Sequence, residues 1–171
     1  MEEIKVLIDE KTLQNKIKEI AENIMQEYKE KEITLICILK GSMYFTVDLS
    51  KYIKNKLKIE VIKVSSYGNE KESSGKINME LNLKESIEGK DVIVVEDIID
   101  TGRTLSYLLD YLRLKNPNSI KLCTLLNKPE RRVFDVKVDY NGFSIPDKFV
   151  VGYGLDYSEY YRNLPYIGYI E

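Results

Sequence analysis

Residues 91–104 read Asp91-Val-Ile-Val-Val-Glu-Asp-Ile-Ile-Asp-Thr-Gly-Arg-Thr104. The four apolar residues after Asp91 are enough for a buried strand, and leucines at helical spacing follow the Thr-Gly-Arg-Thr turn. A strand, a glycine turn and a helix start form an anion site, because free backbone N–H groups meet the positive end of the helix dipole there. Glu96, Asp97 and Asp100 would repel an anion unless a divalent metal or sugar hydroxyls lay between them. The segment therefore predicts a site for a phosphorylated sugar with Mg²⁺.

Apolar strands and amphipathic helices alternate along the rest of the chain. Helices are expected at residues 10–30 and 43–55 and from the glycine turn to about residue 115, and strands at residues 33–39, 59–64, 77–83, 92–95, 120–126, 149–151 and 167–170. This alternation predicts the α/β class, with a central, mostly parallel sheet flanked by helices. Ligands bind such sheets beyond the carboxyl ends of the strands. The polar groups that follow three of the strands should therefore share one edge: Lys40-Gly41, Glu96-Asp97 and Lys128.

The 171 residues suit one compact domain, and their charges are balanced, with 26 basic and 28 acidic residues and a net charge of −2. This balance argues against a protein that binds nucleic acid through bulk electrostatics. Cys37 and Cys123 lie within apolar runs and are expected to be buried thiols in a reducing compartment. The N-terminus lacks a signal-peptide pattern, and no apolar run approaches the roughly 20 residues of a membrane span. We therefore expect a cytoplasmic protein without a membrane or nucleic-acid partner.

The chain contains no histidine. Serine–histidine and cysteine–histidine nucleophile systems are therefore excluded, as are histidine-ligated zinc and iron sites. A general acid or base must be a carboxylate, lysine, tyrosine, cysteine or water. Carboxylate–magnesium chemistry is the natural metal option that remains.

Residues 91–104 resemble the phosphoribosyl-pyrophosphate motif of the type I phosphoribosyltransferases. Asp100, the third carboxylate, narrows the resemblance to the 6-oxopurine branch, the hypoxanthine-guanine phosphoribosyltransferases. Further matches spread over most of the chain: Leu39-Lys-Gly41, Ser65-Ser-Tyr-Gly68 with Ser73-Ser-Gly-Lys76, Lys128, Pro146-Asp-Lys-Phe-Val-Val-Gly-Tyr-Gly-Leu-Asp-Tyr157 and Tyr161-Arg162. The resemblance implies the type I phosphoribosyltransferase fold in one domain of residues 1–171. Its core would span about residues 10–140, and a hood would form from the N-terminal residues and about 141–171. A homodimer or homotetramer is also implied.

The implied reaction transfers the 5-phosphoribosyl group from phosphoribosyl pyrophosphate to hypoxanthine and/or guanine, giving IMP or GMP and pyrophosphate. Its transition state should carry positive charge at C1′ of the ribose. The protein must therefore position two substrates, neutralise pyrophosphate and remove a proton from the base, rather than supply a nucleophile. By the resemblance, Glu96 and Asp97 hold the ribose hydroxyls and Mg²⁺. Asp100 takes the N7 proton as general base.

The resemblance also assigns the phosphate groups. The phosphate-binding segment comprises residues 100–104, Asp100 and Arg103 included. Thr101, Gly102 and Thr104 bind the 5′-phosphate through backbone N–H and hydroxyl groups, while the side chain of Arg103 is expected to face outward. Pyrophosphate meets the backbone of Lys40-Gly41, whose connecting peptide bond is expected to be cis. It also meets the guanidinium fork of Arg162, and a lid of residues 65–76 brings Ser66 and Tyr67 close to it.

For the purine, the resemblance names four residues. Lys128 donates to O6 and so selects 6-oxo over 6-amino bases. Phe149 stacks on the ring, and the backbone carbonyl of Val150 meets its edge. Asp156 orients a metal-bound water or the purine edge.

Simpler interpretations remain open at each position. Glu96-Asp97 fits a solvated strand end, Asp100 a helix cap, Lys40-Gly41 an ordinary strand end, Lys128 a solvated lysine and Phe149 a core residue. Residues 65–76 also fit a surface loop without a role. The tyrosines of the tail would serve subunit contacts or pack the hood. At the level of function, the alternatives are an RNA-binding regulator on the same fold and transfer to xanthine, uracil or adenine.

Overall fold

The structure of the chain, a computed structural model, describes residues 3–64 and 83–170. Its larger sheet has five parallel strands in the order β3-β2-β4-β5-β6. The strands are β2 (Ile33–Leu39), β3 (Leu57–Lys63), β4 (Asp91–Ile99), β5 (Ser119–Asn127) and β6 (Tyr140–Ser144). The predicted α/β class with a parallel central sheet is confirmed.

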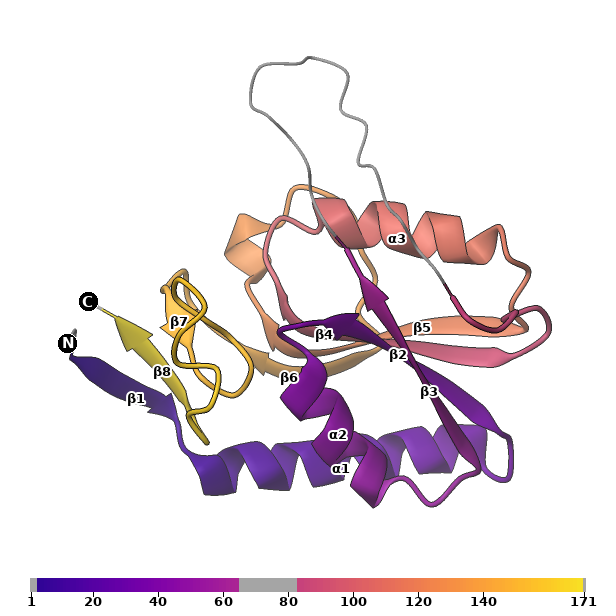
Figure 1. The fold of residues 1–171 in the computed structure, drawn as a ribbon, viewed down its shortest axis with the longest axis horizontal. Coiled ribbons are helices and arrows are strands. Elements are labelled where there is room, and N and C mark those ends of the chain that lie inside the picture. The colour runs from indigo at the N-terminus through magenta and orange to yellow at the C-terminus, as the bar shows by residue number, and fades with distance from the viewer. Residues whose placement is uncertain (1–2, 65–82, 171) are drawn as a thin grey trace, which may run out of the picture.

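Helices cover both faces of this sheet. On one face lie α1 (Glu10–Tyr28) and α2 (Met43–Tyr52), and on the other lies α3 (Arg103–Arg113) (Figure 1). Side chains alternate between the faces along each strand. In β4, Ile93 and Val95 pack with the core under α1 and α2, whereas Val92 and Val94 pack with the leucines of α3. Both faces of the central strands are therefore buried, which explains their continuous apolar runs.

A smaller antiparallel sheet joins the two ends of the chain. Its order is β1-β8-β7, with β1 at Ile4–Ile8, β7 at Val150–Val151 and β8 at Ile167–Ile170. This sheet lies beside one end of the larger sheet (Figure 1). Because β1 pairs with β8, the two ends of the chain are close together. Tyr140–Ser144 pairs with β5, and the larger sheet thus continues past residue 140.

Most of the predicted helices and strands are present, but they begin or end at different residues from those predicted. The helices finish at Tyr28, Tyr52 and Arg113, and β4 runs on through the acidic pair to Ile99. Strands β1 and β6 were not predicted. Strand β6 was missed because it contains Asn141 and Gly142, which are uncommon in strands. A Cβ at Gly142 would come within 2.3 Å of the Leu125 carbonyl oxygen, so the close pairing of β6 with β5 requires glycine there. The strand expected at 77–83 falls outside the described residues except for Leu83, which is in no strand.

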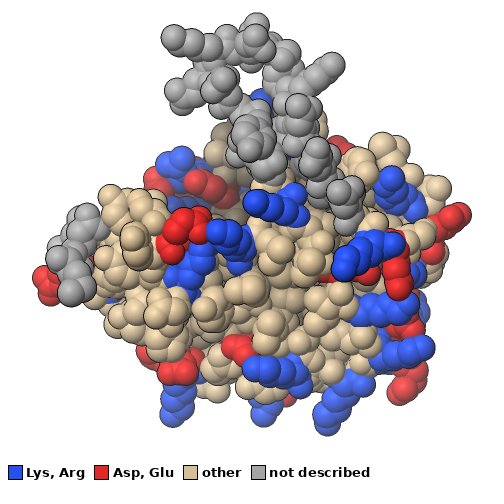
Figure 2. Space-filling view, in the orientation of Figure 1, with Lys and Arg blue, Asp and Glu red and all other residues tan. Residues whose placement is uncertain are grey.

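Cys37 and Cys123 are buried free thiols, as predicted. Basic and acidic side chains are interspersed over the face shown in Figure 2, in keeping with the small net charge. None of the helices in the described ranges is long and apolar enough to cross a bilayer.

Candidate active site

The carboxyl ends of β2, β4 and β5 lie at the same edge of the sheet, because these strands are parallel neighbours. Lys40-Gly41 follows the first strand, the turn to α3 follows the second and Lys128 follows the third. The topology therefore brings together the segments that were expected to share an edge. The acidic pair lies within the last part of β4 rather than after it.

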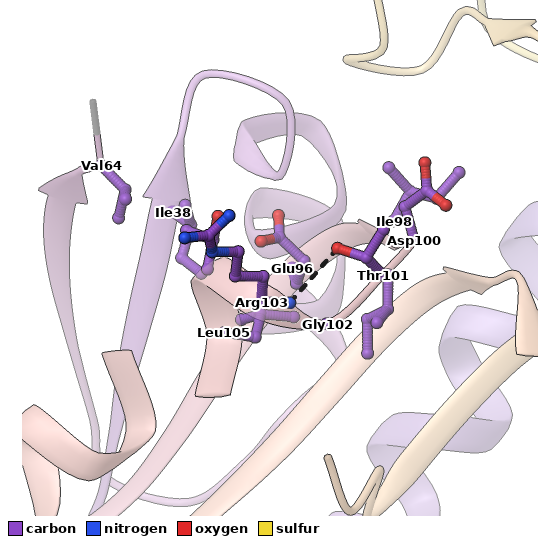
Figure 3. Close-up of a pocket in the computed structure, with 11 residues that line it drawn as sticks. Ile38, Val64, Glu96, Ile98, Asp100, Thr101, Gly102, Arg103 and Leu105 are labelled. Carbon is purple, nitrogen blue, oxygen red and sulfur yellow. Dashed lines mark hydrogen bonds between the residues drawn. The ribbon is translucent and has the colours of Figure 1, made fainter. Parts of the chain in front are cut away.

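A pocket of about 260 Å³ lies at the end of β4. Its wall is formed by Glu96 and the turn from Asp100 to Thr104, with Ile38 from β2 and Val64 from just after β3 (Figure 3). Gly102 caps α3 in the left-handed conformation, with φ at +81° and no side-chain cap. A Cβ at this position would also come within 3.1 Å of the Phe134 carbonyl oxygen. Glycine is therefore required both by backbone conformation and by space.

The first turn of α3 presents backbone N–H groups that have no partner within the helix. One of them, on Arg103, is 3.4 Å from the hydroxyl of Thr101, the contact drawn in Figure 3. The Arg103 side chain is exposed, as expected, and it also lines the pocket. N–H groups and threonine hydroxyls with a helix N-terminus behind them suit a phosphate.

Glu96 and Asp97 form a tight acidic pair. The backbone N–H of Asp97 donates to Glu96 Oε1 at 2.9 Å, and the N–H of Ile98 donates to Asp97 Oδ1 at 2.7 Å. Burial, together with the neighbouring Asp97 carboxylate, raises the pKa of Glu96 well above its usual range. Both side chains are partly buried, so the pair is only partly open to solvent.

The pair suits a divalent cation, which would relieve the repulsion between the two carboxylates. Among the described residues, no group of three or more acidic, cysteine or histidine side chains could hold a metal ion by itself. Mg²⁺ is commonly held by one or two carboxylates and takes its other ligands from water and substrate phosphates. Two adjacent carboxylates beside a phosphate turn fit that pattern.

The loop after β2 lies directly against this pair. A Cβ on Gly41 would be 1.6 Å from Asp97 Oδ2, so the carboxylate occupies the space that any side chain would need. The non-proline cis bond in the described residues is Leu39–Lys40, and the expectation of a cis bond at Lys40–Gly41 is wrong by one residue. Neither bond precedes a proline, and the residue types therefore give no signal that distinguishes them.

Arg162 is bonded to the turn of residues 152–155 and, through Glu159, is linked to the loop after β2. Its Nη1 donates to the Gly154 carbonyl oxygen at 2.7 Å, and its Nη2 is 2.8 Å from Asp156 Oδ1. Glu159 lies between two cationic side chains: it is 3.2 Å from Arg162 Nη2, which was expected to bind pyrophosphate, and 2.5 Å from Lys40 Nζ. Sequence reasoning missed Glu159, because residues 156–162 form no helix and charge spacing along a turn carries no signal.

Lys128, which follows β5, is only 8% exposed. The alternative that it is an ordinary solvated lysine is therefore wrong. Its Nζ is 3.3 Å from Asp147 Oδ1. Asp147 Oδ2 accepts from Arg131 Nη1 at 3.1 Å, and Arg131 Nε donates to Asp100 Oδ1 at 2.6 Å. Because Gly102 is the cap of α3, Asp100 is not a helix cap. Arg131 and Asp147 were not predicted as site residues.

The aromatic side chain of Phe149 is 54% exposed and is therefore not a core residue. Its ring meets that of Tyr157 edge to face, with 5.6 Å between centroids. Val150 is buried in β7. Ser66, Tyr67 and the whole expected lid of residues 65–76 lie outside the described residues.

Known proteins resemble the chain over nearly its full length. A model of the phosphoribosyl transferase domain matches residues 7–158. The hypoxanthine-guanine phosphoribosyltransferase of Bacillus subtilis is 49% identical over 164 residues, which cover 96% of this chain and 91% of the relative. The hypoxanthine phosphoribosyltransferase of Buchnera aphidicola is 48% identical, with 96% and 94% covered. A crystal structure of a hypoxanthine-guanine phosphoribosyltransferase from Bacillus anthracis superposes with a TM-score of 0.93 at 49% identity and covers 99% of this chain and 100% of the other. With this fold, these relatives and a pocket suited to a phosphorylated sugar, the chain belongs to the phosphoribosyltransferase family.

Proposed function

We propose that this chain is a purine salvage enzyme, which transfers the 5-phosphoribosyl group from phosphoribosyl pyrophosphate to hypoxanthine and/or guanine. The products are IMP or GMP and pyrophosphate. One observation carries the proposal: the acidic pair, the N-terminal turn of α3 and the buried Lys128 all meet at the carboxyl edge of one sheet. The relatives named above are hypoxanthine and hypoxanthine-guanine phosphoribosyltransferases.

The sugar phosphate would be held by the residues around the pocket. Thr101, Gly102 and Thr104 would bind the 5′-phosphate with their N–H groups and hydroxyls. Glu96 and Asp97 would hold the ribose hydroxyls and Mg²⁺, and the bound ion would neutralise charge on the pyrophosphate. The pKa of Glu96, raised by burial and by Asp97, favours a cation or a hydroxyl beside this carboxylate over an unshielded anion.

Pyrophosphate would be bound by the backbone of Lys40-Gly41 and by Arg162. In the structure, Glu159 bridges both cationic side chains. A diphosphate would offer the Arg162 guanidinium more oxygens and more charge than Glu159 does, and it would therefore compete with this carboxylate for Arg162. We propose the same neighbourhood for Ser66 and Tyr67.

The purine would lie between Phe149 and the polar groups at the ends of β4 and β5. Asp100 would take the N7 proton, and Lys128 would donate to O6. The Val150 carbonyl and Asp156 would meet the remaining edge. A flat base with a carbonyl oxygen needs an aromatic surface and a hydrogen-bond donor, and the exposed ring of Phe149 and the buried Lys128 could supply these two.

We also propose that the enzyme works in the cytoplasm, that residues 1–171 form one domain with a hood, and that subunits pair as homodimers or homotetramers. Large apolar side chains are exposed on α2 and on the edge strand β3, which supports an association of subunits: Met43, Val47, Ile59 and Val61.

The decisive experiment is a spectrophotometric assay with each base in turn, with and without Mg²⁺. We expect IMP from hypoxanthine and/or GMP from guanine, little product from adenine, and loss of turnover with excess chelator. Absence of both IMP and GMP under these conditions would refute the proposal. Asp100→Asn should lower kcat by about 10²-fold or more and leave binding of phosphoribosyl pyrophosphate nearly unchanged.

A further inference from the structure

Four charged side chains form a continuous row beside the purine end of the site. Lys128 Nζ is 3.3 Å from Asp147 Oδ1, and Asp147 Oδ2 accepts from Arg131 Nη1 at 3.1 Å. Arg131 Nε then donates to Asp100 Oδ1 at 2.6 Å. We call this row the ion-pair chain. It joins the two residues that would contact the reacting edge of the base, Lys128 and Asp100, through two that would not.

Stability alone does not account for the ion-pair chain. Asp100, Arg131 and Asp147 are each about half exposed, and exposed pairs of this kind contribute little to stability because water screens their charges. The Lys128 side chain is only 10% exposed, so its alignment depends on Asp147 rather than on water. Hydrogen bonds from Arg131 and Lys128 lower the pKa of Asp147, which keeps it charged between them.

The two carboxylate oxygens of Asp100 differ in their hydrogen bonds. Oδ1 accepts from Arg131, whereas Oδ2 accepts no hydrogen bond from any other residue within 3–64 and 83–170. A carboxylate held by one oxygen keeps the other available to receive a proton. Arg131 suits this task because its planar fork donates to two carboxylates at once, which the single ammonium of a lysine cannot do with the same fixed angle.

We propose that Arg131 is a positioning residue for the purine. It holds Asp100 with Oδ2 directed to the proton on N7, and through Asp147 it aligns Lys128 for O6. The inference rests on the proposed role of Asp100 as general base. Arg131 itself touches neither substrate, and it acts through its two carboxylate partners.

A double-mutant cycle tests the proposal. We expect Arg131→Gln to lower kcat for IMP or GMP formation about tenfold, because a misplaced base loses part of its effect, and to leave the KM for phosphoribosyl pyrophosphate within about twofold. Arg131→Lys should stay well below wild type, since it keeps the charge without the fork. In an Asp100→Asn background, Arg131→Gln should cause a clearly smaller loss than in the wild type, because only its action on Lys128 through Asp147 remains.

The matched control is Arg113→Gln, which removes an exposed arginine–aspartate pair on α3 with a 2.7 Å contact to Asp110. It should leave every kinetic constant unchanged, and circular dichroism should show all variants folded. An equal loss from Arg131→Gln in both backgrounds, or no loss in the first, overturns the inference while the base assignment stands. Wild-type turnover by Asp100→Asn overturns both, and a wild type that makes neither nucleotide overturns the proposed function itself.

Discussion

Gly41→Ala should damage catalysis without unfolding the protein. In the structure, an added Cβ at this position would be 1.6 Å from Asp97 Oδ2 and 2.6 Å from Asp97 Cγ. The φ angle of Gly41 is not among the positive ones, so alanine can adopt its backbone conformation. The substitution therefore creates a steric conflict with one functional side chain and no backbone strain.

The size of the effect follows from that overlap. Real Cβ atoms do not approach other heavy atoms within 3.0 Å, so Asp97 Oδ2 must move by at least about 1.4 Å, the difference between 3.0 and 1.6 Å. A shift of about 1 Å in a catalytic group costs up to about 10²-fold in rate, or about 2.7 kcal/mol of transition-state stabilisation. The free energy of unfolding should change by less than about 1 kcal/mol, since Asp97 can rotate away and alanine restricts the unfolded chain.

The assay is steady-state kinetics at several Mg²⁺ concentrations, beside a urea denaturation curve. We expect kcat/KM for phosphoribosyl pyrophosphate to fall about 10²-fold and the apparent need for Mg²⁺ to rise. Gly89→Ala is the matched control: φ is +67° and no atom lies within 4 Å of the added Cβ, at the opposite end of β4 from the site. It should cost about 1 kcal/mol of stability and leave kcat/KM unchanged. Wild-type kcat/KM in Gly41→Ala would refute the reasoning.

Three further predictions concern the base and the attachment of the smaller sheet. Lys128→Gln should lower kcat/KM for hypoxanthine by about 10–100-fold and let adenine compete, because the bond to O6 loses its charge; an unchanged hypoxanthine-to-adenine ratio in a competition assay would contradict this. Phe149→Ala should raise the KM of the purine about tenfold through lost stacking and leave that of phosphoribosyl pyrophosphate alone, as initial rates would show, and equal changes in both would argue against a platform. Asp48→Asn should make stability less dependent on pH in acid: burial raises the pKa of Asp48, but hydrogen bonds from Tyr153, Gln14 and Lys51, with the charge of Lys51, outweigh it and hold the pKa below its usual 3.8. The stabilisation is therefore present above that value and lost as pH falls through the lower folded-state pKa, so wild type should lose about 1 kcal/mol more than the variant in acid, allowing for solvent screening. Parallel urea-unfolding profiles against pH would rule that out.

The central strands and helices could be predicted because their signals are local. In β4, the run from Val92 to Val95 is apolar on both faces, and α3 repeats leucines at helical spacing. Strand β6 carries no such signal. Its identity depends on β5 as a partner and on Gly142, whose lack of a side chain makes room for the Leu125 carbonyl oxygen, and neither fact is visible within the segment.

The candidate site likewise contains residues that could be predicted from local sequence and contacts that could not. Glu96, Asp100 and Gly102 could be singled out because they lie within one short motif on a strand, a turn and a helix start. The contact between Arg131 and Asp100 joins residues that are 31 positions apart, and Lys40 meets Glu159 across 119 positions. No spacing rule predicts such pairs, since they depend on how the end of β5 and the turn before β8 reach the edge of the sheet.

Close approaches at two glycines connect the turn after β7 in the smaller sheet with the acidic pair of the larger sheet. A Cβ on Gly154 would come within 2.0 Å of the Gly41 carbonyl oxygen, and a Cβ on Gly41 would come within 1.6 Å of Asp97 Oδ2. The turn after β7, the loop after β2 and the acidic end of β4 are therefore stacked in one row without intervening side chains. Arg162 fastens the outer member of the row, because it donates to the Gly154 carbonyl oxygen. The loop after β2 is thus held between the acidic pair on one side and the turn after β7 on the other. A ligand bound to this loop would contact a segment whose position both neighbours fix. Because neither glycine carries a side chain, three segments from distant parts of the chain can pack directly against one another.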